Sequence, residues 1–563
     1  MSHWNTKTRW AGRPWVAAAA IVVAMWLTGT AQAATPGILG TTTGTTGTTF
    51  NLVAAPSYIS QPDGVQIYSW GYGCTSSFGA TVNYAPAVFS NLKLGFCPTM
   101  QVPGPTLIVT EGQTVTVTLL NNLPGGANAS ILFPGFQITS TSCTGTCPQG
   151  LRALEASPNS TVSYTFTATT PGTRSYFSGT QTDFQVEMGL YGAIVVLPKT
   201  PPASGTGLCY SMGSDQAQKL GVGNTGDDFR LSSAAYDHPE TCYDREYLFQ
   251  FMELDPRIHR QAEEQVQAMT ACLAAPAAGI PCPSSLSVKT EPYHPNYFLI
   301  NGRSMPDDMD PDYAPNYPHQ PYNGNPHMHP GDLVLVRTIG QGHWEHPFHE
   351  HGNHVRILAR DGNLILSQND PNATGTTPAR LAGRMEFTTD TYPGQAWDGI
   401  YYWSGRGLGW DIYGHTPANG AINPPCNPGT PGTINYGFDT TPLSVTNGNY
   451  FEWCADHNHP LEANPVGQIG AGGPATQFDP LVATNGLWYN GTPYLGPDAV
   501  KRNRGNTPLP VGFASQNPLP ESGISFMWHS HNEREITTND VFPGGMLMMM
   551  LVDPPVWFID ETL

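Results

Sequence analysis

Short runs in which apolar or β-branched residues alternate with polar ones recur between residues 50 and 198. Thr106–Thr110, Gln113–Leu119 and Thr161–Thr167 are three such runs, and turn-forming residues follow each of them. Alternation with a period of two is typical of strands that bury one face. The continuous apolar run within Gly189–Pro198 predicts a fully buried closing strand. One β-sandwich fits this length.

A second strand-rich region begins at Tyr297–Gly302 and ends with the apolar run Met546–Val552. The region is too long for one plain sandwich, and its stretch at about 405–520 is dense in Gly, Pro and Asn. We therefore predict a second sandwich over residues 289–563 that carries this stretch as a long insertion. A small third domain inside the insertion is the alternative.

Residues 199–288, between the two regions, follow a different pattern. They contain one helical pattern, Arg257–Leu273, and several cysteines, so we predict a disulfide-rich connector with one helix. A Thr/Gly tract precedes the first region, and we predict that residues 34–49 form a flexible leader. The predicted fold class is all-β, with two Greek-key β-sandwich domains over 50–198 and 289–563.

Composition agrees with this fold class and adds a location. The 563-residue chain has 61 Gly and 53 Pro, as expected for many short strands joined by turns. Residues 1–33 predict a signal peptide, since Lys7, Arg9 and Arg13 precede an apolar stretch and Ala31–Ala33 offers a cleavage site. An uncleaved anchor is the alternative, but the apolar stretch is short for a membrane span. We expect an exported protein, periplasmic or extracellular, with no membrane span after cleavage.

Charge and cysteine content limit the partners and the redox environment. The formal charge of −19 becomes −22 when the three cations of the signal peptide are removed, and such acidity excludes nucleic acid as a partner. Ten cysteines in an exported chain predict up to five disulfides. Pairing neighbours in sequence order is one arrangement among those the sequence leaves open: Cys74–Cys97, Cys143–Cys147, Cys209–Cys242, Cys272–Cys282 and Cys426–Cys454.

Histidines concentrate at two places in the second region. His343, His346, His349, His351 and His354 follow one apolar run, and two more precede the last strand. On an extended chain, residues two apart share a face, so His349 and His351 form one pair. His529 and His531 form the other pair. Two such pairs, brought together, present four imidazoles, which suit copper, zinc or iron.

The segments around these histidines carry a family pattern. His346–Gly352, which reads His-Pro-Phe-His-Glu-His-Gly, and Trp528–His531, with Gly545–Met546 downstream, resemble the third and fourth copper motifs of multicopper oxidases. Gln185–Gly192, Asn296–Arg303 and Glu111–Val115 resemble further segments of the family. The resemblance implies cupredoxin-like domains. It also implies a type 1 copper that passes electrons through a Cys to a three-copper cluster held by eight histidines.

The chain departs from the family at three of the four motifs. Leu132–Gln137 and Tyr176–Gln181 stand where the first and second motifs carry His-x-His. Ser530 replaces the type 1 Cys, and Glu535 replaces the second type 1 His. A hydroxyl cannot supply the Cu–thiolate bond of a blue copper site, so we expect no type 1 site. With four cluster ligands missing, we expect no intact three-copper cluster either.

The resemblance leaves half a cluster. We predict that His349, His351, His529 and His531 hold copper, with iron or zinc as alternatives. His346 and His354 are additional ligand candidates, and Glu535 or Glu350 is a candidate proton-handling carboxylate.

Three functions stay open. The first is a copper-dependent oxidoreductase that acts on a metal ion, a phenolic compound or a reduced oxygen species as its small reducing substrate. The second is a non-catalytic cupredoxin scaffold at the cell surface, with an electron-transfer or assembly partner. The third is a periplasmic copper or iron carrier.

Overall fold

The computed structural model describes most of both predicted sandwiches. The predicted signal peptide, Cys209 and nearly all of the predicted insertion, including Cys426 and Cys454, lie outside the described residues. The described residues are 36–74, 83–85, 97, 99–202, 234–276, 280–328, 332–366, 381–403, 492–494, 523–553 and 559.

Two sheets form the first sandwich. One sheet has the order β10-β11-β6-β1-β5 among the described strands, and the other has the order β2-β3-β7-β9-β8, with β4 on β3. The strands of the first sheet are β1 (Gly37–Leu39), β5 (Asn83–Ala85), β6 (Leu107–Thr110), β10 (Gly172–Phe177) and β11 (Tyr191–Leu197). Those of the second are β2 (Thr41–Thr43), β3 (Gly47–Ser60), β4 (Gln66–Cys74), β7 (Thr114–Asn121), β8 (Ile138–Thr144) and β9 (Thr161–Thr167).

The core of this sandwich follows the predicted alternation. In β7, Val115, Val117 and Leu119 are buried while the residues between them are at least partly exposed. They pack in one apolar cluster with Ile194 and Val196 of the facing sheet. The all-β prediction is therefore confirmed for this domain.

Two further sheets form the second sandwich. One has the order β13-β12-β15-β21-β17-β18 among the described strands, with β19 on β17, and the other β14-β24-β23-β16-β20, with β22 on β23. The strands of the first sheet are β12 (Arg245–Leu254), β13 (Tyr297–Ile300), β15 (Leu333–Gly340), β17 (Val355–Arg360), β18 (Asn363–Leu364), β19 (Met385–Glu386) and β21 (Ala396–Tyr402). Those of the second are β14 (His327–Met328), β16 (His346–Glu350), β20 (Thr388–Thr391), β22 (Thr492–Tyr494), β23 (Gly523–Ser530) and β24 (Leu547–Val552).

Aromatic residues fill the space between these two sheets. Phe249 of β12 and Trp397 of β21 share one apolar cluster with Phe348 of β16 and Trp528 of β23. The rings of Phe348 and Trp528 lie 5.9 Å apart, edge to face. The two strands that carry the predicted metal ligands, β16 and β23, are thus each anchored in the core by an aromatic residue.

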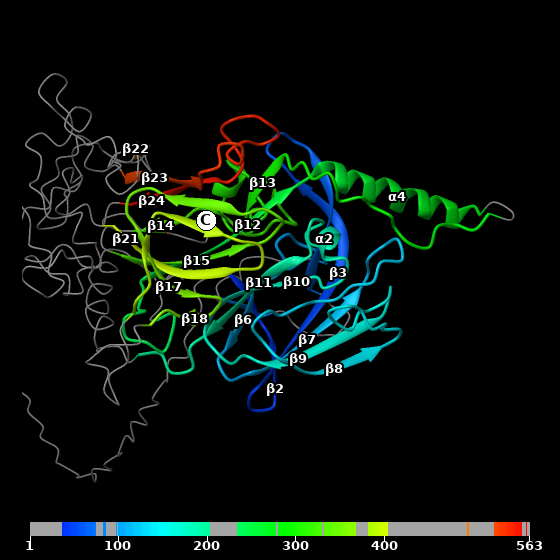
Figure 1. Ribbon diagram of the computed structural model, residues 1–563, viewed down its shortest axis with the longest axis horizontal. Helices are drawn as coiled ribbons and strands as arrows, with labels where there is room; N and C mark the ends of the chain where they lie inside the picture. Colours follow the sequence, from blue (N-terminus) through cyan, green and yellow to red (C-terminus); the bar gives the residue numbers. More distant parts are fainter. Residues whose placement is uncertain are drawn as a thin grey trace, which may run out of the picture. The chain divides into compact units, whose positions relative to one another are not determined.

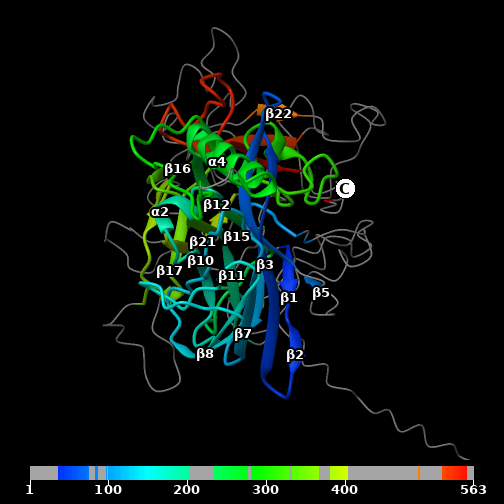
Figure 2. The ribbon, with the colours of Figure 1, turned by 90° about the vertical axis from the view of Figure 1, so that its right-hand side faces the viewer.

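The predicted flexible leader is wrong for the described residues. Gly37–Leu39 lies in the first sheet beside β6, and Thr41–Thr43 pairs with the start of β3. β3 then pairs in parallel with β7 over eight residues, from Gly47–Thr114 to Ala54–Asn121 (Figure 2). The Thr-rich composition that suggested flexibility also suits a strand, since β-branched residues favour extended backbone.

The predicted connector, 199–288, is wrong in its second half. Arg245–Leu254 forms β12, a fully buried strand between β13 and β15. The helix α4 (Pro256–Ala274) follows β12 directly and extends the predicted Arg257–Leu273 by one residue at each end (Figure 1). It begins where the Asp255 carboxylate accepts the Arg257 backbone N–H, with Pro at the first helical position. Two shorter helical segments are α2 (Thr182–Gln185) and η2 (Asp307–Met309).

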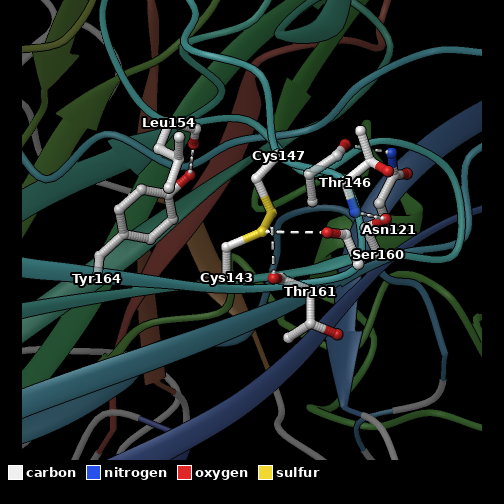
Figure 3. Close-up of a disulfide and its surroundings, with 10 residues drawn as sticks. Asn121, Cys143, Thr146, Cys147, Leu154, Ser160, Thr161 and Tyr164 are labelled. Atoms are coloured by element: carbon white, nitrogen blue, oxygen red, sulfur yellow. Dashed lines mark hydrogen bonds between the residues drawn. A yellow bond between two sulfur atoms is a disulfide. The ribbon is translucent and has the colours of Figure 1, made fainter.

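Three of the predicted disulfides are confirmed: Cys74–Cys97, Cys143–Cys147 and Cys272–Cys282. Cys242 is also disulfide-bonded. Figure 3 shows Cys143–Cys147 beside Thr161 of β9, where the Thr146 N–H donates to Ser160 Oγ at 2.9 Å. This disulfide therefore closes a loop that lies against a central strand of the first sandwich.

An apolar cluster joins the two sandwiches. It contains Val53 and Val102 from the first sandwich with Met252 and Leu299 from the second. The Val102 N–H also donates to the carbonyl of His319 at 2.8 Å. Within the described part of the chain, no helix is long and apolar enough to cross a membrane.

Candidate metal centre

The register of two neighbouring strands brings the predicted histidines together. β16 and β23 are antiparallel, with His349 opposite His529 and Phe348 opposite Ser530. Phe348 faces the core between the sheets, so the odd-numbered histidines of both strands lie on the other face. A one-residue slip of either strand would separate the two pairs.

The four rings form a compact group. The ring centroid of His349 lies 4.7 Å from that of His351, 5.6 Å from that of His529 and 4.9 Å from that of His531. His529 lies 5.3 Å from His351 and 5.5 Å from His531. Four imidazoles around one tetrahedral ion, with metal–nitrogen distances near 2.0 Å, would place their ring centres about 5 Å apart. The five distances between the rings are close to this value.

Hydrogen bonds fix the orientation of two of these rings. His529 Nδ1 lies 2.7 Å from the Ser530 carbonyl oxygen, which can only accept, so Nδ1 carries the proton. In the neutral ring, Nε2 then presents its lone pair, and it points at His351 Nε2, 3.3 Å away. His349 Nδ1 is hydrogen-bonded to Thr388 Oγ1 of β20 at 2.6 Å. His349 Nε2 is buried and has no hydrogen-bond partner among the residues that the structure describes.

The environment keeps His349, His351 and His529 neutral at physiological pH. Burial, followed by the charges of the neighbouring imidazoles, lowers the pKa of His349 to about 4 and that of His351 to about 3. Burial is also the main cause that lowers the pKa of His529. Only the neutral imidazole binds metal, so these shifts favour ligation over protonation.

The chemistry of the donors fits a transition metal, although the side-chain arrangement is not that of a loaded site. Among the described residues, no group of three or more His, Cys, Asp or Glu side chains is arranged to hold a metal ion. The unpartnered Nε2 of His349 nevertheless costs free energy in a buried position unless another group binds it. The His349–Thr388 hydrogen bond resembles the outer contact that orients a metal-binding histidine.

His346 belongs to a different structure. It is fully buried, with Nε2 3.0 Å from Glu253 Oε2 and Nδ1 2.9 Å from Glu535 Oε2. Both ring nitrogens are therefore engaged by carboxylates, and neither is available to a metal ion. These two contacts argue against His346 as an additional ligand, and that role stays a prediction.

His346 and Glu535, which the resemblance assigns to the type 1 copper motifs, form an ion triad with Glu253 instead. Ser530 donates its hydroxyl to Glu535 Oε2, and Asn532 donates to Glu535 Oε1 at 2.9 Å. Burial lowers the pKa of His346, but the hydrogen bonds and charges of the two carboxylates outweigh it and raise that pKa to about 9. Glu253 could not be identified from the sequence, because it lies in β12, within the segment interpreted as a connector.

The remaining predicted residues lie apart from the four rings. His354 packs edge to face on Phe387 at 4.8 Å, and Phe387 also contacts His349 at 5.8 Å. Glu350 shares the inner face of β16 with Phe348 and accepts from the Thr389 hydroxyl at 3.0 Å. Burial raises the pKa of Glu350 well above its usual range. Glu535 belongs to the triad, where it contacts His346 and Ser530.

The segments that replace the first two copper motifs lie side by side. Leu132 and Phe177 form a β-bridge, with hydrogen bonds in both directions between their backbones. The first sandwich therefore keeps the two segments adjacent without histidines in them.

Comparison with known proteins agrees with the resemblance read from the motifs. A family model described as multicopper oxidase matches residues 97–201, within the first sandwich. No curated protein matches the chain. The resemblance to multicopper oxidases is therefore confirmed, and the matched segment contains no histidine.

Several solved structures are similar to the chain at low identity. A multicopper oxidase is 14% identical, with 91% of this chain and 87% of that chain covered and a TM-score of 0.39. Blue copper oxidase from Nitrosomonas europaea is 13% identical, with 89% and 85% covered and a TM-score of 0.39. Copper nitrite reductase from Nitrosomonas europaea is 17% identical, with 63% and 85% covered and a TM-score of 0.35.

Proposed function

We propose that this multicopper oxidase-like protein is exported and binds one copper ion at the cluster of His349, His351, His529 and His531. We further propose that it acts there as an oxidoreductase without a type 1 relay. The buried, unpartnered Nε2 of His349 is the observation that carries the proposal. A buried nitrogen without a hydrogen-bond partner costs free energy, and a bound metal ion would offset that cost.

The four histidines and Thr388 would have different roles in binding the copper ion. His349, His351 and His529 are held neutral and present nitrogen lone pairs, and Thr388 fixes the His349 ring. His531, whose side chain is 51% exposed, lies at the solvent side and offers an entrance for the ion. Bound copper would supply one-electron chemistry. Because Ser530 stands where the relay Cys would be, a reducing substrate or partner would have to reach the cluster directly.

Metal content per chain tests the proposal. We expect about one copper per chain in protein purified from its export compartment, with no intense blue absorption band. The His349→Ala/His531→Ala variant should lose the metal. His294→Ala, which removes an exposed histidine, is the matched control and should keep it.

Other outcomes would point elsewhere. Several coppers per chain with a blue band would mean that Ser530 and the missing motifs have been misinterpreted. If the parent protein holds no metal, even after reloading, the oxidoreductase hypothesis is refuted and the non-catalytic scaffold is the hypothesis that remains.

A copper carrier is the second candidate, and the exposure of His531 favours it. An ion with one half-exposed ligand can leave more easily than one enclosed on all sides. A carrier would release its copper to a mild chelator within minutes and show no turnover with phenolic or metal-ion substrates. An enzyme would keep its copper during turnover.

A further inference from the structure

A cleft opens between the two sandwiches, and none of the four cluster histidines lines it. Its volume is about 350 Å³. This lies at the lower end of the range for small-molecule sites, about 300–1,000 Å³. Phe177 and Val186 line the cleft from the first sandwich, and His343 and Pro393 line it from the second. A cleft of this size can hold a small organic molecule but not a folded partner.

The apolar part of the cleft is built from residues that also hold the two sandwiches together. Val186 belongs to the apolar cluster that joins the sandwiches, and Phe177 packs against that cluster. Gly394 has a φ of 77°, and a Cβ added there would lie 3.9 Å from Phe177 Cε1. Glycine adopts this backbone conformation without strain, so the chain can turn close beside the Phe177 ring. Phe177 and Val186 therefore offer a firm surface on which an apolar group of a ligand can pack.

Arg152 lines the cleft from the tip of a short turn. A backbone hydrogen bond of 2.9 Å between the end residues closes the Gly150–Ala153 turn. The disulfide Cys143–Cys147 in the preceding loop braces it (Figure 3). The Arg152 side chain is exposed and has no hydrogen bond or ion pair within the described part of the chain. Its guanidinium is therefore available to bind a carboxylate of a ligand through two parallel hydrogen bonds.

Asp183 lines the same cleft from α2 and carries the opposite charge. Its Oδ2 accepts the Thr290 hydroxyl at 2.9 Å, and among the described residues its carboxylate forms no ion pair. Arg152 and Asp183 thus line one small cleft without pairing with each other. A cation and an anion held apart in this way are complementary to a small molecule that carries both charges.

We propose that the cleft binds a free amino acid with an apolar or aromatic side chain. Arg152 binds its carboxylate, Asp183 binds its ammonium group, and its side chain packs on the apolar part of the cleft. A molecule of the same shape with one charge leaves either Arg152 or Asp183 without a partner. The cleft contains no proposed copper ligand, so this site goes beyond the proposed function and does not depend on it.

Calorimetric titration of metal-free protein with three ligands tests the proposal. L-phenylalanine carries both charges, 3-phenylpropanoate lacks the ammonium group, and 2-phenylethylamine lacks the carboxylate. The protein must be metal-free because amino acids bind copper themselves. We expect phenylalanine to bind about tenfold more tightly than either analogue, since each analogue loses a charge-assisted hydrogen bond. Equal affinity for the three ligands, or no binding of phenylalanine at millimolar concentration, would overturn the proposal.

Substitutions at two exposed positions identify the groups that bind. Arg152→Gln should weaken the binding of phenylalanine about tenfold and leave that of 2-phenylethylamine unchanged, because this analogue has no carboxylate. Asp183→Asn should weaken phenylalanine in the same way and leave 3-phenylpropanoate unchanged. Arg260→Gln, which removes an exposed arginine of α4 outside the cleft, is the matched control and should bind phenylalanine as the parent does. Unchanged phenylalanine binding in both Arg152→Gln and Asp183→Asn would show that the ligand binds elsewhere.

The His349→Ala/His531→Ala variant separates this proposal from the copper site. It should bind phenylalanine as the parent does, since neither histidine lines the cleft. If that variant loses phenylalanine binding, the ligand lies at the histidine cluster and the cleft is not its site. Copper content, measured on other samples, decides the proposed function independently of this result.

Discussion

At the scale of single residues, the contact that shapes the cluster most is the one between His349 and Thr388. It fixes the ring so that Nε2, and not Nδ1, faces its neighbours. We predict that Thr388→Val weakens copper binding about 10- to 100-fold, the usual effect of removing an outer hydrogen bond from a ligating histidine. Thr388→Ser keeps the hydroxyl and should restore most of the affinity. Copper titration against a competing chelator measures both, and equal affinity in all three proteins would contradict the assignment.

The residues of the candidate site could be predicted from the sequence only where the evidence lies in neighbouring positions of the chain. His349 and His351 are two positions apart on one strand, so their shared face follows from strand geometry. That His346 lies between two carboxylates could not be predicted, because its partner Glu253 lies 93 residues earlier in the sequence. A carboxylate inside a fully buried strand is the one signal that could have been noticed, since such a group needs a partner.

At the scale of strands, the alternating runs were predicted well and the Thr/Gly tract was not. Alternation fixes which face of β7 and β9 is buried, and the structure has the expected burial in both. The tract 37–49 has little local signal. Its strands β1 and β3 pair with β6 and β7, which lie 69 and 67 residues further along the chain. Pairing with strands so distant in sequence produces no local pattern of residues from which these strands could be predicted.

Truncation of the tract tests whether those strands matter. We predict that removing residues 36–46 lowers the stability of the first sandwich by about 2 kcal/mol or more, because the burial of Ile38 alone is worth that much. Replacement of the exposed Thr41, Thr42 and Thr43 by Ser is the control and should change little. Chemical denaturation followed by fluorescence would measure both. An unchanged transition in the truncated protein would restore the flexible leader.

At the scale of the whole molecule, the cluster histidines and His346 change the stability of the fold in opposite directions as pH rises. In the cluster, His349 has its pKa lowered to about 4 and His351 to about 3. At these two residues the unfolded chain therefore binds more protons than the folded one below about pH 6.5. Their contribution to stability is present above that pH and is lost as pH falls. His346 has its pKa raised to about 9, so its contribution is complete below about pH 6.5 and is lost as pH rises through 9.

Metal-free protein should therefore be most stable near pH 6.5, with stability falling on both sides by up to about 1.4 kcal/mol per pH unit for each titrating group. Denaturant unfolding between pH 4 and 10 would show this maximum. His346→Gln should remove the fall on the alkaline side, although it lowers stability throughout because two buried carboxylates lose their counter-charge. His349→Ala should reduce the fall on the acid side alone. A parent protein whose stability rises steadily from pH 6.5 to 9 would show that His346 does not hold its proton between Glu253 and Glu535.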